Sequence, residues 1–375
     1  MSKWKTETLK SLTLQITDGK HGDCQNENNS GYYFISCKDI FDEKIHYTDA
    51  RQITYADYLD THKRTRLEIN DILITNSGTI GRMAFISDAE LCKKTTFQKS
   101  VAIVKPDPQK IYPKYLYYLL QSLVGSFVNS SNGSAQKNLL LSTMRDFSVC
   151  YINDVPVQRK IADVLSAYDD LIENNRKQIK LLEEAAQRLY KEWFIDLRFP
   201  GHKTTPIING IPDGWEKTLL GNLIEIKYGK DHKNIPDGNI PVYGSGGFMR
   251  KCSQALHQGE AVLIPRKGSL NNIMYVNETF WTVDTMFYAL MKQQNIGFFV
   301  YFLLKSFDMY AMNIGAAVPS MTTSILNAID VVVPSATLLG NFHRAINFLF
   351  SKISILKKQN DKLLESRDRL LQKLL

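Results

Sequence analysis

The sequence predicts an α+β protein in which two similar mixed α/β domains lie at opposite ends of an antiparallel two-helix coiled coil, an internal duplication with a pseudo-twofold axis. Two heptad helices and a series of matched segments in the two halves predict this arrangement. The length of 375 residues also exceeds what one hydrophobic core normally holds. The expected segments are residues 1–155 for the first domain, 156–199 for the first helix, 200–333 for the linker and second domain, and 334–375 for the second helix.

Each predicted helix carries one seam whose positions alternate steps of four and three residues, which is typical of a coiled coil. The first helix begins beside Pro156, a residue suited to a first helical turn, and stops before Pro200. The second seam has the same phase, displaced by 181 residues. The first seam consists of Ile161, Leu165, Tyr168, Ile172, Asn175, Ile179, Leu182, Ala186, Leu189 and Trp193. The second consists of Phe342, Ile346, Leu349, Ile353, Leu356, Asn360, Leu363, Arg367, Leu370 and Leu374.

The two halves match in five places that occur in the same order along the chain. Each half contains a short strand that ends in a Gly-Lys turn, and then a buried strand that runs into a polar, glycine-bearing loop. A helix, a glycine loop and a strand ending in Val-Pro complete each copy, so an internal duplication is predicted. The matched segments are residues 15–21 and 225–231, 71–78 and 261–268, 112–122 and 296–306, 133–138 and 315–320, and the Val-Pro pairs at 155–156 and 333–334.

The two seams are expected to pair, because an unpaired seam would expose a long row of apolar side chains. An antiparallel pairing that places Asn175 opposite Asn360 overlaps the helices end to end, and a buried polar pair would set their register. The alternative is that each amphipathic helix packs separately on its own domain. The same register pairs Ile161 with Leu374, Tyr168 with Arg367, Ile179 with Leu356 and Trp193 with Phe342.

Composition and charge exclude some classes of protein. No apolar run is long enough to span a membrane, and five scattered cysteines without a Cys-x-x-Cys pair indicate a reducing, cytoplasmic environment. The net charge of +8 permits a polyanionic partner. Residues 334–375 carry eight Lys/Arg against three Asp/Glu, which fits either a nucleic-acid-facing surface or a solvated helix face.

A rod of this kind would hold two similar domains a fixed distance apart. At about 1.5 Å per residue each seam is roughly 50 Å long. On B-DNA this length corresponds to on the order of 14 base pairs. Two different domains at that spacing would read a split, asymmetric DNA sequence with an unread spacer.

At three segments the chain resembles the specificity (S) subunits of type I restriction–modification systems, and the resemblance extends over essentially the whole length. The segments are Gln158–Ala162, Leu165–Asn175 and Leu189–Asp196. The second helix departs from the pattern, because no Gln-Arg pair follows Pro334 and Trp193-Phe194 have no counterpart at its end.

The resemblance implies two target-recognition domains, each reading one half of a bipartite DNA site. It also implies two methyltransferase (M) subunits as partners, with restriction (R) subunits added in the nuclease complex. S-adenosylmethionine, and ATP with Mg²⁺ for restriction, would then bind the partner subunits, and this chain would need no cofactor.

The sequence contains no pattern that indicates catalysis in this chain. A phosphate-binding Gly-x-x-x-x-Gly-Lys-Ser/Thr loop is absent, and the seven histidines show no metal-ligand spacing. The Asn/Asp-Pro-Pro-aromatic motif of adenine methyltransferases and a nuclease carboxylate set are also missing. We therefore expect no catalytic and no metal-binding residues, which argues against a self-sufficient modification enzyme.

Glycine loops at strand ends are the expected places for DNA contacts, because the backbone can approach DNA closely there. Arg266-Lys267 is the strongest pair, since two adjacent cations on a glycine loop have little structural purpose. The main alternative is a coiled-coil scaffold whose domains bind proteins rather than DNA. The first-domain candidates are Lys20, His21, Asn76, Ser77, Arg82, Gln98, Lys99, Gln136 and Lys137. The second-domain candidates are Lys230, His232, Lys233, Tyr243, Ser245, Arg250, Arg266, Lys267 and Asn271.

Overall fold

A computed structural model describes residues 4–131, 137–312 and 319–375. The chain is a mixed α/β protein, as the sequence predicts, and it divides into two compact units. The first unit contains residues 1–174 and 359–375, and the second contains residues 175–358. Both unit boundaries fall inside long helices, so each unit holds one end of each helix. No helix in the described residues is long and apolar enough to cross a membrane.

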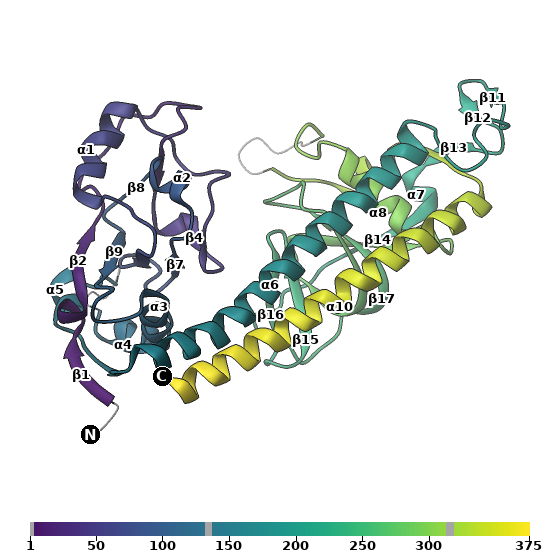
Figure 1. Cartoon of the computed structure of the whole chain (residues 1–375). Helices are drawn as coiled ribbons and strands as arrows, with labels where there is room; N and C mark the ends of the chain where they lie inside the picture. The colour runs from purple at the N-terminus through teal and green to yellow at the C-terminus, as the bar shows by residue number, and fades with distance from the viewer. Residues whose placement is uncertain (1–3, 132–136, 313–318) are drawn as a thin grey trace. The chain divides into compact units, whose positions relative to one another are not determined.

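The first unit is built on a four-stranded antiparallel sheet with the order β2-β9-β6-β7. Figure 1 labels three of its strands, β2, β9 and β7. These strands are rich in β-branched and other apolar residues, and β6 and β9 are buried along their whole length. A separate antiparallel pair joins β1 to β10, the strand that precedes the first long helix. The strands are β1 Trp4–Thr8, β2 Thr13–Asp18, β3 Tyr33–Ile35, β4 Ile40–Phe41, β5 Lys44–Ile45, β6 Ile72–Thr75, β7 Met83–Phe85, β8 Thr95–Phe97, β9 Val101–Pro106 and β10 Ser148–Ile152.

Short helices pack on this sheet and complete the core of the first unit. Helix α3 begins with Pro113 at its first position and buries Tyr115 and Tyr118 completely. One core cluster joins α3 and the sheet to both long helices, through Leu165 and Leu371. The shorter helices are α1 Tyr55–Thr65, α2 Ala89–Cys92, α3 Pro113–Ser122, α4 Val124–Asn129 and α5 Leu141–Asp146, with 3-10 turns at Leu9–Leu12 and Cys37–Asp39.

The second unit repeats this topology. Its strands β14-β19-β17-β18 follow the same antiparallel order as β2-β9-β6-β7, and β15 and β16 extend the sheet beyond β18. Strand β13 pairs with β20, the strand that precedes the second long helix, just as β1 pairs with β10. The elements are β11 Ile207–Ile208, β12 Ile211–Pro212, β13 Glu216–Leu219, α7 Leu220–Leu223, β14 Ile224–Tyr228, β15 Ile240–Gly244, β16 Gly247–Cys252, β17 His257–Pro265, β18 Met274–Thr282, β19 Met286–Met291, α8 Gly297–Ser306, α9 Thr323–Asn327 and β20 Asp330–Val333.

The long helices are α6 (Val155–Tyr190) and α10 (Ala336–Leu374). The Asp154 carboxylate accepts a hydrogen bond from the backbone N–H of Val157 at 3.2 Å and caps α6. The chain continues as a π-helical turn from Lys191 to Ile195. The helix ends there, short of the predicted residue 199, because Leu197 has a left-handed φ of 54°.

In the second unit the two helix segments run antiparallel. The rings of Trp193 and Phe342 lie 5.8 Å apart, as predicted, while Glu183 forms an ion pair with Lys357 at 4.0 Å. From the first contact to the second, the residue number falls along the first helix and rises along α10, so the two helices run in opposite directions. Every predicted seam residue is buried or half-buried, including Asn175 and Asn360. These two asparagines belong to different units, and their sharing one layer stays a prediction.

Candidate nucleic-acid interface

The predicted loops of the first unit gather at one edge of its sheet. In an antiparallel sheet of order β2-β9-β6-β7, the end of β2, the start of β9, the end of β6 and the start of β7 all lie at the same edge. Backbone hydrogen bonds join the loops there: Lys20 N donates to Phe97 O at 2.8 Å, and Asn76 N donates to Ser100 O at 3.0 Å. Lys99 N also donates to Lys20 O, at 3.2 Å.

Several predicted side chains at this edge are engaged within the protein. The Lys20 ammonium lies 3.0 Å from Asp57 and 3.4 Å from Asp60. The hydrogen bond to Asp57 raises the pKa of Lys20, and the Gln25 backbone N–H together with Lys20 lowers the pKa of Asp57. His21 Nε2 lies 2.8 Å from Asp18. Lys20 is therefore a cation partly neutralised by these two carboxylates.

The other first-unit candidates divide by exposure. Asn76 is buried, and its Oδ1 accepts no hydrogen bond within the described part of the chain, so this side chain does not reach the surface. Ser77 and Gln98 are half-buried, and Ser77 pairs with Asn138 through a β-bridge. Gln136 lies outside the described residues. The exposed candidates are Arg82, Lys99 and Lys137.

The second unit presents an equivalent edge, arranged around residues 282–285. Lys230 N donates to Thr282 O at 2.9 Å, and Arg266 N donates to Thr285 O at 2.8 Å. These two contacts match those of Lys20 and Asn76 in the first unit. Asn272 Nδ2 donates to Ser245 O at 2.9 Å, which brings the loop after β15 to the same place.

This second edge also exposes unpaired cationic charge. Within the described residues, the ammonium groups of Lys230, Lys233 and Lys267 form no ion pair. The guanidinium of Arg266 lies 5.6 Å from the ring centre of Tyr228, which is half exposed. A cation and an exposed aromatic ring at one loop can contact phosphates and bases together.

The structure assigns internal roles to other second-unit candidates. Arg250 donates hydrogen bonds to Asp237 at 2.9 Å and to the carbonyls of His232 and Ile235, so it holds the loop that follows β14. The phenol of Tyr243 donates to Glu278. The Asn271 Oδ1 accepts from Met309 N at 2.9 Å. Arg250 thus stabilises the loop that carries Lys230 and Lys233. The position of Arg250 in the sequence alone did not reveal this role.

Both Gly-Lys turns depend on a close backbone contact. A Cβ added to Gly19 would lie 2.0 Å from Phe97 O, and one added to Gly229 would lie 2.0 Å from Val283 O. Only glycine allows the two backbone segments to approach this closely. The repeated Gly-Lys pair therefore marks the same backbone junction in each unit.

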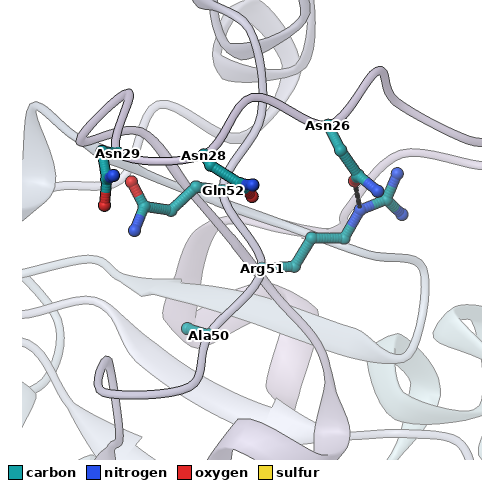
Figure 2. Close-up of a pocket in the computed structure, with 6 residues that line it drawn as sticks. All are labelled: Asn26, Asn28, Asn29, Ala50, Arg51 and Gln52. Atoms are coloured by element: carbon teal, nitrogen blue, oxygen red, sulfur yellow. Dashed lines mark hydrogen bonds between the residues drawn. The ribbon is translucent and has the colours of Figure 1, made fainter.

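A polar recess that the sequence reasoning missed lies in the first unit, between the segment that precedes β3 and the segment that precedes α1. Its volume is about 450 Å³. Figure 2 shows the amide groups of Asn28, Asn29 and Gln52 along it, and the hydrogen bond from Arg51 to Asn26. Side-chain amides donate and accept hydrogen bonds at base edges. The asparagines at 26–29 are the sequence signal that could have identified the recess. It is lined by Asn26, Asn28, Asn29, Ala50, Arg51 and Gln52.

The geometry defines a class of protein rather than a catalytic centre. Two units of one topology each present a loop-bearing sheet edge, and each carries one end of both long helices. Within the described ranges, no three His, Cys, Asp or Glu side chains are grouped to hold a metal ion. The structure is that of a duplicated protein whose two units carry different side chains at equivalent sheet edges.

Comparison with known proteins identifies the family. The model of the type I restriction modification DNA specificity domain matches residues 1–184 and 212–363, so the chain belongs to this family. Specificity subunits of type I systems are non-catalytic, and catalysis resides in other subunits.

Individual relatives agree with this assignment. The chain is 27% identical over 347 residues to the type I restriction enzyme MjaIX specificity subunit of Methanocaldococcus jannaschii, covering 81% of this chain and 76% of that protein. It is 21% identical to the HindI specificity subunit of Haemophilus influenzae, covering 100% and 99% of the two chains. The crystal structure of a type I system S subunit from M. genitalium shares the fold, with a TM-score of 0.56, 18% identity and coverage of 99% and 96%.

Proposed function

We propose that this chain is the DNA-sequence-recognition subunit of a type I restriction–modification complex. Its two units would read the two halves of a bipartite, asymmetric site, held at opposite ends of an antiparallel coiled coil. The observation that carries the proposal is the repeated reading edge, in which a Gly-Lys turn and the loop after a buried strand bracket one backbone segment in each unit.

The residues displayed at the two edges differ, which supports an asymmetric target. The first unit pairs Lys20 with carboxylates, exposes Lys99 and Lys137, and contains a recess lined by amides. The second unit offers unpaired lysines and Arg266 beside an exposed tyrosine. Amides read base edges by paired hydrogen bonds, while lysines chiefly contact phosphates. The two half-sites are therefore proposed to differ in sequence.

The long helices are proposed to set the distance between the half-sites and to bind the partner subunits. Each unit exposes two apolar helix residues seven positions apart: Val164 and Leu171 in the first, Phe348 and Ile355 in the second. Residues seven apart lie on one side of a helix, so each pair can pack against a helix of another protein. We assign these positions to two methyltransferase (M) subunits, with restriction (R) subunits joining in the nuclease complex.

The partner subunits are proposed to supply the chemistry. S-adenosylmethionine would bind the methyltransferase subunits, and ATP with Mg²⁺ would serve the restriction subunits. The complex would act on double-stranded DNA in the cytoplasm.

The test is purification with a co-expressed methyltransferase subunit, followed by mapping of methylated adenines in genomic DNA. The expected result is one non-palindromic sequence with two defined parts and a spacer of fixed length. Two identical half-sites, or the absence of salt-sensitive DNA retention, would favour a protein-binding scaffold.

Arg266 and Lys267 give the sharpest residue-level test of the proposed reading edge. The double substitution to alanine should weaken DNA binding and reduce the dependence of log K on log salt concentration by about one to two, since each phosphate contact contributes about 0.9. Lys217 is exposed on β13 and provides the matched control, so Lys217→Ala should leave both quantities unchanged. Unchanged affinity of the Arg266/Lys267 variant at physiological salt would contradict the assignment.

A further inference from the structure

Arg367 is a buried cation at a seam position of α10. The guanidinium Nη1 donates to Asp169 on α6 at 2.6 Å and to Glu43 at 2.8 Å, and Nη2 donates to Asp368 at 3.0 Å. All four residues belong to the first unit. The predicted seam register placed Tyr168 opposite Arg367, and the guanidinium of Arg367 pairs with Asp169, the residue next to Tyr168. The seam tolerates this arginine because three carboxylates accept its hydrogen bonds.

The cluster extends into the core of the first unit. The Tyr118 phenol donates to Asp169 at 2.5 Å, and the Lys114 ammonium lies 4.5 Å from the centre of the Phe85 ring. Burial lowers the pKa of Lys114, although the nearby carboxylates oppose this effect. Burial would also lower the pKa of Arg367, but its hydrogen bonds to Glu43 and Asp169 raise it. Asp169 and Glu43 thus act on both Lys114 and Arg367, and the four charged side chains form one interacting group.

Glu43 belongs to the tight turn between β4 and β5. Asp42 and Glu43 both have left-handed φ values, 48° and 63°, which a two-residue hairpin turn requires. Glu43 pairs with Arg367 on α10, and the next residue, Lys44, pairs with Glu173 on α6. Two consecutive residues of one hairpin therefore attach it to both helices.

The same hairpin is connected to the reading edge of the first unit. Arg82, one of the predicted DNA contacts, donates to the carbonyl of Ile40 on β4 at 3.4 Å. Just before the hairpin, Cys37 N donates to the Ser100 hydroxyl at 3.1 Å, and Ser100 O accepts from Asn76 N. The contacts run without interruption from the helices to the loops that would meet DNA.

In the second unit, aromatic rings occupy the place that corresponds to the charged cluster around Arg367. The 181-residue displacement places Phe350 at the position of Asp169, and Ala186 at that of Arg367. Phe350 packs against Phe298 at 4.8 Å, and Phe298 stacks on Tyr275 at 4.2 Å. Packed apolar side chains generally stabilise a protein at least as much as a buried ion pair does. A gain in stability therefore does not explain why the first unit uses charged side chains here. A guanidinium nitrogen that donates to two carboxylates from different segments, by contrast, requires one definite geometry.

We propose that the Glu43–Arg367–Asp169 cluster is a positioning device, which sets the angle of the first recognition unit on the helices and so determines how strictly the complex measures the distance between half-sites. This inference rests on the proposed function. Arg367 and Glu43 touch no DNA in this scheme. They act through the β4–β5 hairpin.

The experiment uses the full chain in complex with its methyltransferase subunits. Affinities are measured for three duplexes that carry the mapped half-sites with the native spacer, or with a spacer one base pair shorter or longer. Arg367→Met keeps most of the side-chain volume and should reduce the preference for the native spacer roughly tenfold, a typical coupling within one charged network. Glu43→Gln removes the partner charge from the hairpin side and should have the same effect, which keeps the test valid if Arg367→Met does not fold.

Arg369→Met is the matched control. Arg369 lies two residues further along α10, is largely exposed and pairs with Glu365, so its loss should leave the spacer preference unchanged. A purely structural role for Arg367 would lower the affinity for all three duplexes equally, and this outcome would overturn the inference. Failure of the unmodified complex to distinguish its target from a scrambled duplex would refute the proposed function itself, and this inference with it.

Discussion

Gly229 shows how a single residue can determine a reading edge. Its φ is not left-handed, so backbone conformation does not require glycine there; the carbonyl of Val283 does, because it occupies the space of a Cβ. Gly229→Ala should lower the free energy of unfolding by about 2–3 kcal/mol, the cost of forcing extra volume into a packed site. Gly246→Ala, in the same unit with open space around it, should change this free energy by less than about 0.5 kcal/mol. Urea unfolding of the purified chain measures both; equal midpoints would contradict the contact.

At the residue scale, the structure brings the predicted Gly-Lys turns and polar loops together at one end of each sheet. That these edges contact DNA stays a prediction. The partners that decide which side chains are free come from distant segments: Asp57 lies on α1, and the carbonyls that bind Arg250 lie on another loop. Local spacing therefore could not show that Lys20 is paired while Lys230 is not.

Helix α10 offers a comparison within one element. Ile353 is buried at a seam position, whereas Ile355, two residues later, is half exposed. Ile353→Ala should lower the free energy of unfolding by about 2–4 kcal/mol through the lost contacts and the cavity. Ile355→Ala should change the stability of the free chain by less than about 0.5 kcal/mol. It should instead weaken methyltransferase binding, which titration calorimetry measures. Full partner affinity for the Ile355 variant would exclude this residue from the docking surface.

The starts of the long helices could be predicted because their signals are local. Asp154 and Pro156 mark the beginning of α6, and Ser335 caps α10 through its hydroxyl. The π-helical turn at Lys191–Ile195 has no comparable signal. It ends in an aromatic group in which Phe194 packs on Phe299 and Phe342, so the tertiary packing determines that end.

The proposed ruler function can be tested on the whole molecule. Inserting seven residues after Ile179 in α6 and seven after Leu356 in α10 preserves both heptad patterns and lengthens the pair by about 10 Å. The mapped methylation site should keep both half-sites, with a spacer longer by about three base pairs. An insertion in α6 alone breaks the match between the helices and should abolish specific methylation. An unchanged spacer after the double insertion would show that the helices do not set the distance.

The sequence by itself determined the duplication, the two helices and which loops lie at one end of each sheet, because these depend on periodicity and on short-range turn chemistry. Tertiary structure alone decided which charged groups are available. Burial and ion pairing join residues far apart in the chain, as when Arg367 meets Glu43 and Asp169. The 181-residue repeat shows that Phe350 and Ala186 stand at the positions of Asp169 and Arg367. It does not show that Arg367 meets Glu43, because that contact arises only where the helices pack against the first unit.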